Sequence, residues 1–247
     1  VAAIGLINTK EEAAYHNIKH TRASDTPIKI LFGRTETIRN CASLLQLQSS
    51  NHDASHSLAP WRPAIVKARN NQVFRVVIGP SGGDRGYNAI TGIHSWGIAY
   101  WIDDKLIPEI HVKRGNNYTF VIETGDDPSK QAKYHPMYIT NNREGGGGQR
   151  LQELNTPQHQ VYAGISFKNS VPDPSPGAGR YCELVINEID QPNHSNSIEE
   201  YRKTLNLVCE PGNVATFVWT PDNNTPDLVY YQVNSFYIHV LYVFINH

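Results

Sequence analysis

The chain lacks several features that would point directly to a function. None of its 247 residues fall in an apolar run of the ~20 residues that a membrane-spanning helix needs. Positive and negative charges nearly balance, with 22 Lys and Arg against 23 Asp and Glu. This balance gives no electrostatic reason to expect nucleic acid or an anionic membrane as a partner.

Cysteine is scarce. The chain has three, Cys41, Cys182 and Cys209, and an odd number leaves one unpaired or bonded to a partner outside the chain. Cys182 and Cys209 each lie in a stretch typical of a β-strand. We therefore predict a disulfide between them, and the alternative is two buried thiols.

Three N-glycosylation sequons begin at Asn117, Asn193 and Asn223. Together with the predicted disulfide, they favour an extracellular or secreted location. The chain starts at Val1 rather than Met, in the middle of an apolar pattern. We interpret it as a fragment whose natural start lies upstream, so its first residues indicate neither the presence nor the absence of a signal peptide.

The order of apolar and polar stretches predicts an all-β protein. Residues 1–41 contain two short apolar stretches typical of strands, and residues 42–60, rich in Ser, His, Asn and Gln, predict a linker. From residue 61 onward, alternating stretches such as 72–79 and 118–123 are separated by turns rich in Gly, Pro, Asn and Asp. This pattern predicts a sandwich or barrel, with a helix only near Ser197–Arg202.

Motifs that would suggest an enzyme are incomplete. The Gly-rich segment 79–86 follows a strand but lacks the Gly-Lys-Ser/Thr ending of a phosphate-binding loop, and we expect no helix after it. It therefore predicts a wide turn with several positive φ angles. Four carboxylates are scattered among turns and strand ends and suggest no acid/base pair: Glu109, Glu123, Asp126 and Asp127.

A group of aromatic residues suggests a surface on which a carbohydrate could stack. Strand alternation would place Trp96 and Tyr100 on one face of a sheet and Trp101 on the other, so we expect one of the two sets to lie in the core. The group consists of Trp96, Tyr100, Trp101, Tyr118, Tyr134 and Tyr138.

Five long motifs, in this order and spacing, resemble the C-terminal domain of the Skeletor/Knickkopf family. The resemblance covers roughly residues 60–232, and the motifs read GPSGGDRGYNAITGIHSWGIAYWID, LIPEIHVKRGNNYTFVIETGDDP, AKYHPMYIT, LVCEPG and WTPDNNTPDLVYYQ. A shorter match, with AAIG and LFGRTETIRNC, makes residues 1–41 similar to the end of the DOMON domain that precedes it in that family.

The resemblance implies a cupredoxin-like (plastocyanin-like) Greek-key β-sandwich over residues 61–232, after a DOMON remnant. It also implies a non-enzymatic role, namely the organisation of cuticle and chitin as in Knickkopf. The partners would then be extracellular matrix components, with chitin as one candidate. Two alternatives stay open. One is a copper-binding electron-transfer domain in the intact parent protein, and the other is a Skeletor-like scaffold of a nuclear spindle matrix.

The resemblance also implies where copper would bind. A blue-copper centre needs two imidazoles and a thiolate. By family layout His135 is the first imidazole, and a Cys and then a His follow the tyrosine pair. Here Gln232 is followed by Val233, so the thiolate is absent and we expect no cofactor in this chain. His239 could imitate the second imidazole, or it is an ordinary histidine in a strand.

Residues 233–247 no longer resemble the family. They are rich in Phe, Tyr, Ile, Val and Asn, which AT-rich codons encode, so our hypothesis is read-through into an unspliced intron. The alternative is a natural, divergent C-terminus. In either case the sandwich would lose its usual last strand, and the apolar tail could pair at the open edge or aggregate.

Overall fold

A computed structural model gives the fold of residues 58–143, 159–169, 171–187, 191–233 and 241–246. The predicted DOMON remnant with Cys41, the linker up to residue 57, and His239 lie outside the described residues. No described helix is both long and apolar enough to cross a membrane.

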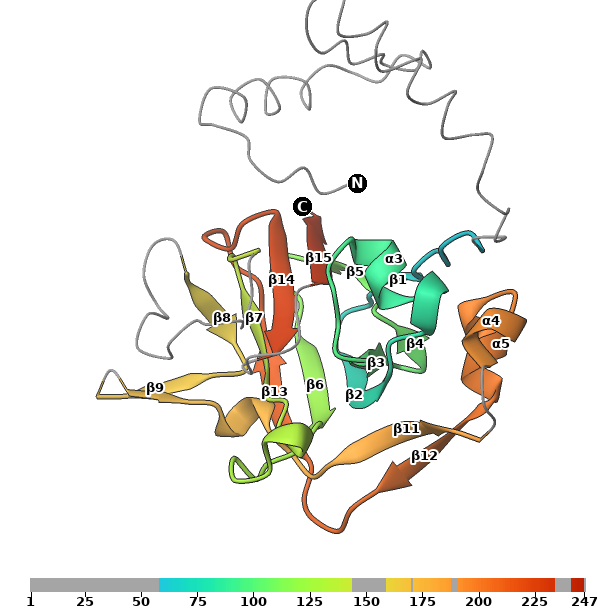
Figure 1. Ribbon diagram of the computed structural model, residues 1–247. Coiled ribbons are helices and arrows are strands. Elements are labelled where there is room, and N and C mark those ends of the chain that lie inside the picture. The colour runs from blue at the N-terminus through green and yellow to red at the C-terminus, as the bar shows by residue number, and fades with distance from the viewer. Residues whose placement is uncertain (1–57, 144–158, 170, 188–190, 234–240, 247) are drawn as a thin grey trace, which may run out of the picture. The chain divides into compact units, whose positions relative to one another are not determined.

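The first of two large sheets has six strands in the order β1-β5-β15-β14-β7-β8 (Figure 1). β14 pairs antiparallel with β15 on one side and with β7 on the other, whereas β15 runs parallel to β5. The strands are β1 (Ile65–Lys67), β5 (Glu109–Lys113), β15 (Leu241–Asn246), β14 (Leu228–Val233), β7 (Met137–Thr140) and β8 (Val161–Ala163).

The second sheet is built around β2. One edge of β2 pairs antiparallel with β3, and the other pairs in parallel with β6 and then with β11. β13 continues the sheet beyond β6, β12 beyond β11, and β4 beyond β3. Its strands are β2 (Gln72–Pro80), β3 (Ile98–Ile102), β4 (Lys105–Leu106), β6 (Tyr118–Glu123), β11 (Cys182–Ile186), β12 (Leu205–Cys209) and β13 (Ala215–Trp219), and a separate pair is formed by β9 (Ser166–Lys168) and β10 (Val171–Asp173).

Helices are short and lie in the connections. The predicted helix is confirmed as α5, where the Ser197 hydroxyl accepts from the Glu200 amide as an N-cap. The Gly-rich turn is also confirmed, with φ of 83° at Gly82 and 56° at Gly83. The expectation that no helix follows that turn is wrong. The helices are η1 (Gly83–Arg85), α3 (Tyr87–Thr91), η2 (Gln131–Lys133), η4 (Ser175–Gly177), α4 (Gln191–His194) and α5 (Ile198–Lys203).

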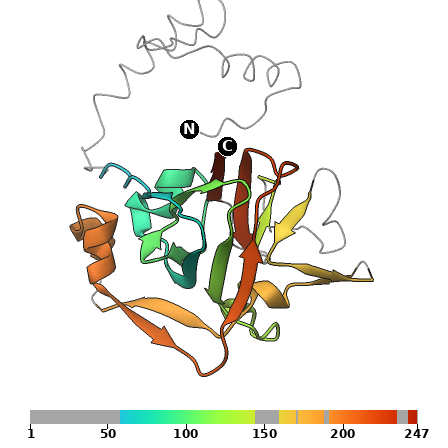
Figure 2. The same cartoon turned by 180° about the vertical axis from the view of Figure 1, so that it is seen from behind.

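The core lies between the two sheets. Phe74, Phe120 and Phe217 stack across β2, β6 and β13, with neighbouring ring centroids 5.1 Å apart. Tyr100 of the second sheet packs against Tyr231 of the first, with ring centroids 6.3 Å apart. The predicted all-β sandwich is confirmed, and its two layers can be followed from both sides (Figures 1 and 2).

β3 is buried on both faces, which corrects the expectation of an exposed aromatic face. Strands β11 and β12, together with the connection between them that contains α4 and α5, are here called the excursion. The excursion covers the outer side of β3, where Trp101 packs against Tyr201 of α5 with 6.1 Å between ring centroids. Of the candidate stacking aromatics, Trp96 is 68% exposed and Tyr134 is half-buried, whereas the others are core residues: Tyr100, Trp101, Tyr118 and Tyr138.

The C-terminal residues complete the first sheet. β15 lies between β14 and β5 and pairs with both, so the edge that a missing last strand would leave is filled. Its alternate residues Val243 and Ile245 are 1% and 4% exposed. The sandwich therefore includes residues beyond 232, within the segment that no longer resembles the family.

This arrangement predicts that a charge at Val243 unfolds the domain. Val243→Asp would bury an unpaired carboxylate between β5 and β14 and should lower the free energy of unfolding by at least about 3 kcal/mol. Val218→Asp, on the exposed face of β13 (61% exposed), is the matched control and should change it little. Urea denaturation measures both, and equal stability of the two variants would contradict the placement of β15.

Candidate metal centre

His135, the metal ligand that the sequence predicts, lies just before β7 and is 4% exposed. Its amide donates to the Thr124 carbonyl oxygen at 3.1 Å. Its own carbonyl oxygen accepts from the Thr124 hydroxyl at 2.7 Å and from the Tyr100 phenol at 3.0 Å. Pro136 follows and disfavours helical backbone at His135. Three hydrogen bonds therefore hold the backbone that carries the imidazole.

A glycine allows the segment before His135 to approach the end of β6. Gly125 has φ of 101°, and a Cβ at this position would lie 1.5 Å from the Lys133 carbonyl oxygen. Any side chain here would push η2 away from β6, so the position of His135 depends on this glycine.

One nitrogen of the His135 imidazole is hydrogen-bonded, and the other has no hydrogen-bond partner among the described residues. Nε2 lies 3.0 Å from the Ala132 carbonyl oxygen, which can only accept, so Nε2 carries the proton. Nδ1 is buried and has no hydrogen-bond partner among the described residues. Burial lowers the pKa of His135, which outweighs the opposite effect of the bond to Ala132. The ring is therefore neutral, with a buried lone pair, as a metal ligand requires.

Val233 lies at the same end of the first sheet. It is the Cα partner of Met137 in the β7–β14 ladder, and His135 is two residues before Met137. The side chain of Val233 is fully buried. The β7–β14 ladder thus brings His135 and the position predicted for the thiolate to the same end of the first sheet. Valine at that position offers no donor atom.

The described residues do not fit a blue-copper centre. Within them, the single group of three close His, Cys, Asp or Glu donors is Glu123, Cys182 and Cys209, and it does not include His135. The two cysteines of that group are joined to each other in a disulfide, so neither supplies a thiolate. His135 alone is one ligand, and no step of copper chemistry follows from it.

The disulfide joins directly opposed residues of β11 and β12, with an S–S distance of 2.01 Å. Beside it lies the carboxylate of Glu123, with Oε1 3.3 Å from Cys182 Sγ. Arg180 donates to Glu123 Oε1 through Nε at 2.8 Å, and Arg75 donates to Oε2. Sequence reasoning missed this cluster because it depends on the pairing of β2 with β6, which no local pattern reveals.

Two arginines keep Glu123 ionised. Burial raises the pKa of Glu123, but the hydrogen bonds and charges of Arg75 and Arg180 outweigh it and hold the pKa below the ordinary value of 4.5. A general acid at neutral pH needs a raised pKa. Glu123 is therefore a structural anion rather than a proton donor.

The remaining predicted residues are separate. Asp127 is held by Ser129 and Glu109 by His111, so these carboxylates have different partners from Glu123. The structure places all three sequon asparagines on the surface, on different elements: Asn117, Asn193 and Asn223.

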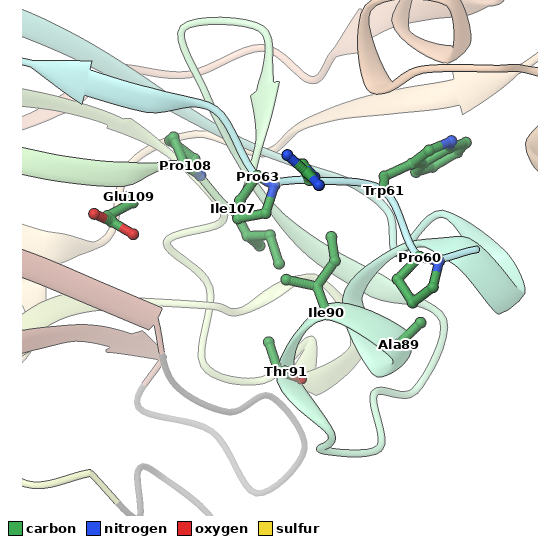
Figure 3. Close-up of a pocket in the computed structure, with 10 residues that line it drawn as sticks. Pro60, Trp61, Pro63, Ala89, Ile90, Thr91, Ile107, Pro108 and Glu109 are labelled. Carbon is green, nitrogen blue, oxygen red and sulfur yellow. The ribbon is translucent and has the colours of Figure 1, made fainter. Parts of the chain in front are cut away.

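A shallow pocket of about 330 Å³ lies between the start of the described chain, α3 and the turn before β5 (Figure 3). Ile90 and Ile107 form much of its apolar wall, and Pro60 and Pro63 flank it (Figure 3). The carboxylate of Glu109 at its edge binds His111 at 2.5 Å. The pocket offers an apolar surface but no pair of catalytic groups.

Comparison with known proteins supports the sequence resemblance. No family model matches the chain. Two Drosophila melanogaster proteins, Protein Skeletor isoforms B/C and isoforms D/E, are each 42% identical to it over 161 residues, or 65% of this chain. Over this segment the chain is similar to Skeletor. The match spans 20% of Skeletor isoforms B/C and 11% of isoforms D/E, so it represents a small part of these relatives.

Two solved structures that are similar to this chain, a rusticyanin and a multicopper oxidase, share little of its sequence. Reduced rusticyanin is 12% identical, with 83% of this chain and 95% of that chain covered and a TM-score of 0.32. A multicopper oxidase variant from Aquifex aeolicus is 10% identical, with 77% and 30% covered and a TM-score of 0.33. At these scores the neighbours carry no argument about the fold or about copper in this chain. The expected β-sandwich rests on the two sheets described above.

The donor set predicts that a single substitution changes the optical response to metal. With Cys41→Ser as background, the full chain with Cu(II) should show no sulfur-to-copper charge-transfer band, because the described end offers an imidazole and no thiolate. Val233→Cys should produce such a band, whereas Val233→Ser should not. Adding His135→Ala to Val233→Cys should abolish it. A band in the background protein would contradict this account, and so would its persistence without His135.

The Glu123 cluster predicts a dependence of stability on pH. Since the folded pKa lies below the unfolded one, ionised Glu123 stabilises the fold at neutral pH, and the contribution is lost as pH falls through the folded pKa. Glu123→Gln should lower the free energy of unfolding at pH 7 by about 2 kcal/mol and flatten its acid dependence. Glu210→Gln removes an exposed pair with Lys133 and serves as control. Equal acid profiles for both variants would refute the assignment.

Proposed function

We propose that this chain belongs to a non-enzymatic structural or interaction module of an extracellular, matrix-organising protein. The observation that carries the proposal is the 42% identity to Skeletor over 161 residues. The described residues add a disulfide, which favours an oxidising compartment. A nuclear spindle-matrix scaffold, the alternative location, is less compatible with that bond.

The surface supports interaction rather than chemistry. Glu123 is held ionised by two arginines, and the pocket at Pro60 and Ile107 has no catalytic pair. Trp96, just before β3, is 68% exposed, so much of its indole ring is in contact with solvent. Sugar rings stack on exposed aromatic rings, so chitin is the matrix component that we propose as a ligand.

A copper-binding electron-transfer role is a second candidate, for an intact parent protein rather than for this chain. The observation that favours it is the buried Nδ1 of His135, which has no partner among the described residues. A buried nitrogen acceptor that lacks a partner is costly to the fold, so it deserves an explanation. A ligand role in relatives that retain the thiolate would supply one.

The test is retention of the secreted full chain on insoluble chitin. We expect cosedimentation that Trp96→Ala weakens roughly tenfold, because it removes the exposed ring. Val171→Ala, which truncates a side chain that is 64% exposed on β10, is the matched control and should bind like the wild type. No retention would exclude chitin as the ligand.

A further inference from the structure

An apolar band crosses the outer face of the second sheet. In the paired register, Val218 of β13 lies beside Thr119 of β6, which lies beside Val73 of β2. Val218 is 61% and Val73 is 56% exposed. In the next row along the same face, half-buried Val121 of β6 lies between exposed Thr216 of β13 and exposed Arg75 of β2. Single exposed valines are ordinary, but here Val73 and Val218 flank Thr119 in one row and Val121 follows in the next, so the apolar groups of these four residues form a short band that ends at Arg75.

The rest of this face is covered by the chain itself. Over β3, the β11–β12 excursion and α5 bury Trp101, and Gly79 packs so closely beneath Trp101 that a Cβ there would lie 2.6 Å from the indole ring. The band on β13, β6 and the start of β2 lies beyond this cover. Both views show α4 and α5 at the opposite side of the sheet from β13 (Figures 1 and 2).

A sequon asparagine stands at the end of this band. Asn117 immediately precedes β6, and Thr119, the hydroxyl residue of its sequon, lies in the valine row. Residues two apart on a strand point to the same face, so Asn117 and Thr119 share the outer face of the sheet. The Thr220 hydroxyl, next along β13, donates to Asn117 Oδ1 at 2.7 Å, which confirms that side.

The side-chain amide nitrogen of Asn117 takes no part in the contacts that hold the described part of the fold. Its oxygen is held by Thr220, so the nitrogen Nδ2, which carries the sugar in N-glycoproteins, is directed away from that bond. Nδ2 donates to none of the described residues. A sugar attached there begins about two residues, or roughly 7 Å, from the valine row, which is within reach of one or two sugar rings.

We propose that Asn117 carries an N-glycan whose first sugars lie on the band formed by Val73, Thr119, Val121 and Val218 and shield it from water. The apolar face of a pyranose ring would cover the valines, while its hydroxyls remain in solvent. In the transfer, Asn117 Nδ2 attacks C1 of a lipid-linked oligosaccharide. The N–C bond forms, the C1–O bond to the lipid diphosphate breaks, the amide releases one proton, and the lipid diphosphate leaves.

The other two sequons are not placed to do this. Asn193 lies on α4, on the excursion away from β13. Asn223 lies in a tight turn in which Thr225, its sequon hydroxyl residue, is 3% exposed and donates to Asp222 at 2.7 Å. Either residue can receive a glycan during synthesis, but only the glycan at Asn117 shares a strand face with the valines.

The experiment uses the full chain, fused to a secretion signal and secreted from insect cells. Peptide mass analysis after enzymatic deglycosylation, which converts a glycosylated Asn to Asp, should show Asn117 occupied. Asn117→Gln and Thr119→Ala each destroy the sequon by a different route, and Thr119→Ser preserves it. Both sequon-loss variants should bind an apolar fluorescent dye at least about twofold more than the wild type and should self-associate, whereas Thr119→Ser should not. Asn193→Gln is the matched control and should behave like the wild type.

Restoring the shield by another means completes the test. In the Asn117→Gln background, Val73→Thr with Val218→Thr should return dye binding to the wild-type level, because the band is then polar. Circular dichroism and the thermal midpoint verify folding of every variant. The inference depends on the secretory route proposed above. Occupancy of Asn193 or Asn223 with Asn117 bare would overturn this inference alone, whereas no glycan on any sequon would overturn the secretory route as well. An occupied Asn117 whose loss leaves dye binding unchanged would also refute the shielding.

Discussion

The junction of β2, β6 and β11 is the constraint on which the rest of the domain depends. β2 pairs with β6 as far as Val77 and with β11 at Ile78, so two parallel neighbours meet along one edge. Glu123 stands at this meeting point and binds Arg75 from β2 and Arg180 from the segment before β11. A buried carboxylate is costly unless its cations are in place, so we infer that the cluster selects one register for the three segments.

Both specialised parts of the domain are attached to this junction. On one side, the disulfide between Cys182 and Cys209 closes the base of the excursion, and the excursion in turn buries Trp101. On the other side, Thr124, the residue after the buried carboxylate, provides two of the three backbone hydrogen bonds that hold His135. The placement of the imidazole and the cover over β3 therefore share one origin, although they lie on different strands.

Local patterns were enough to predict the strands with clear alternation and the helix with an N-cap, since Ser197 and Glu200 are visible in the sequence. The helix Tyr87–Thr91 was missed because it is short and begins at a glycine without a side-chain cap. The Glu123 cluster was missed for a different reason. Its members are brought together by the parallel pairing of strands that are distant in the sequence. The burial of both faces of β3 likewise depends on the excursion, whose position over β3 is not predicted by any hydrophobic periodicity in the sequence.

The first sheet shows why the fold and the metal site can be separated. A blue-copper centre needs a particular donor at the end of β14, but the core needs only an apolar side chain there, and Val233 is fully buried. The same holds for β15, where alternation of Val243 and Ile245 satisfies the sheet although the segment does not resemble the family. A sandwich can therefore be closed without a complete set of metal ligands, because packing requires volume and polarity while ligation requires specific atoms. It follows that the function of this chain is better sought on its outer faces than at the end that holds His135.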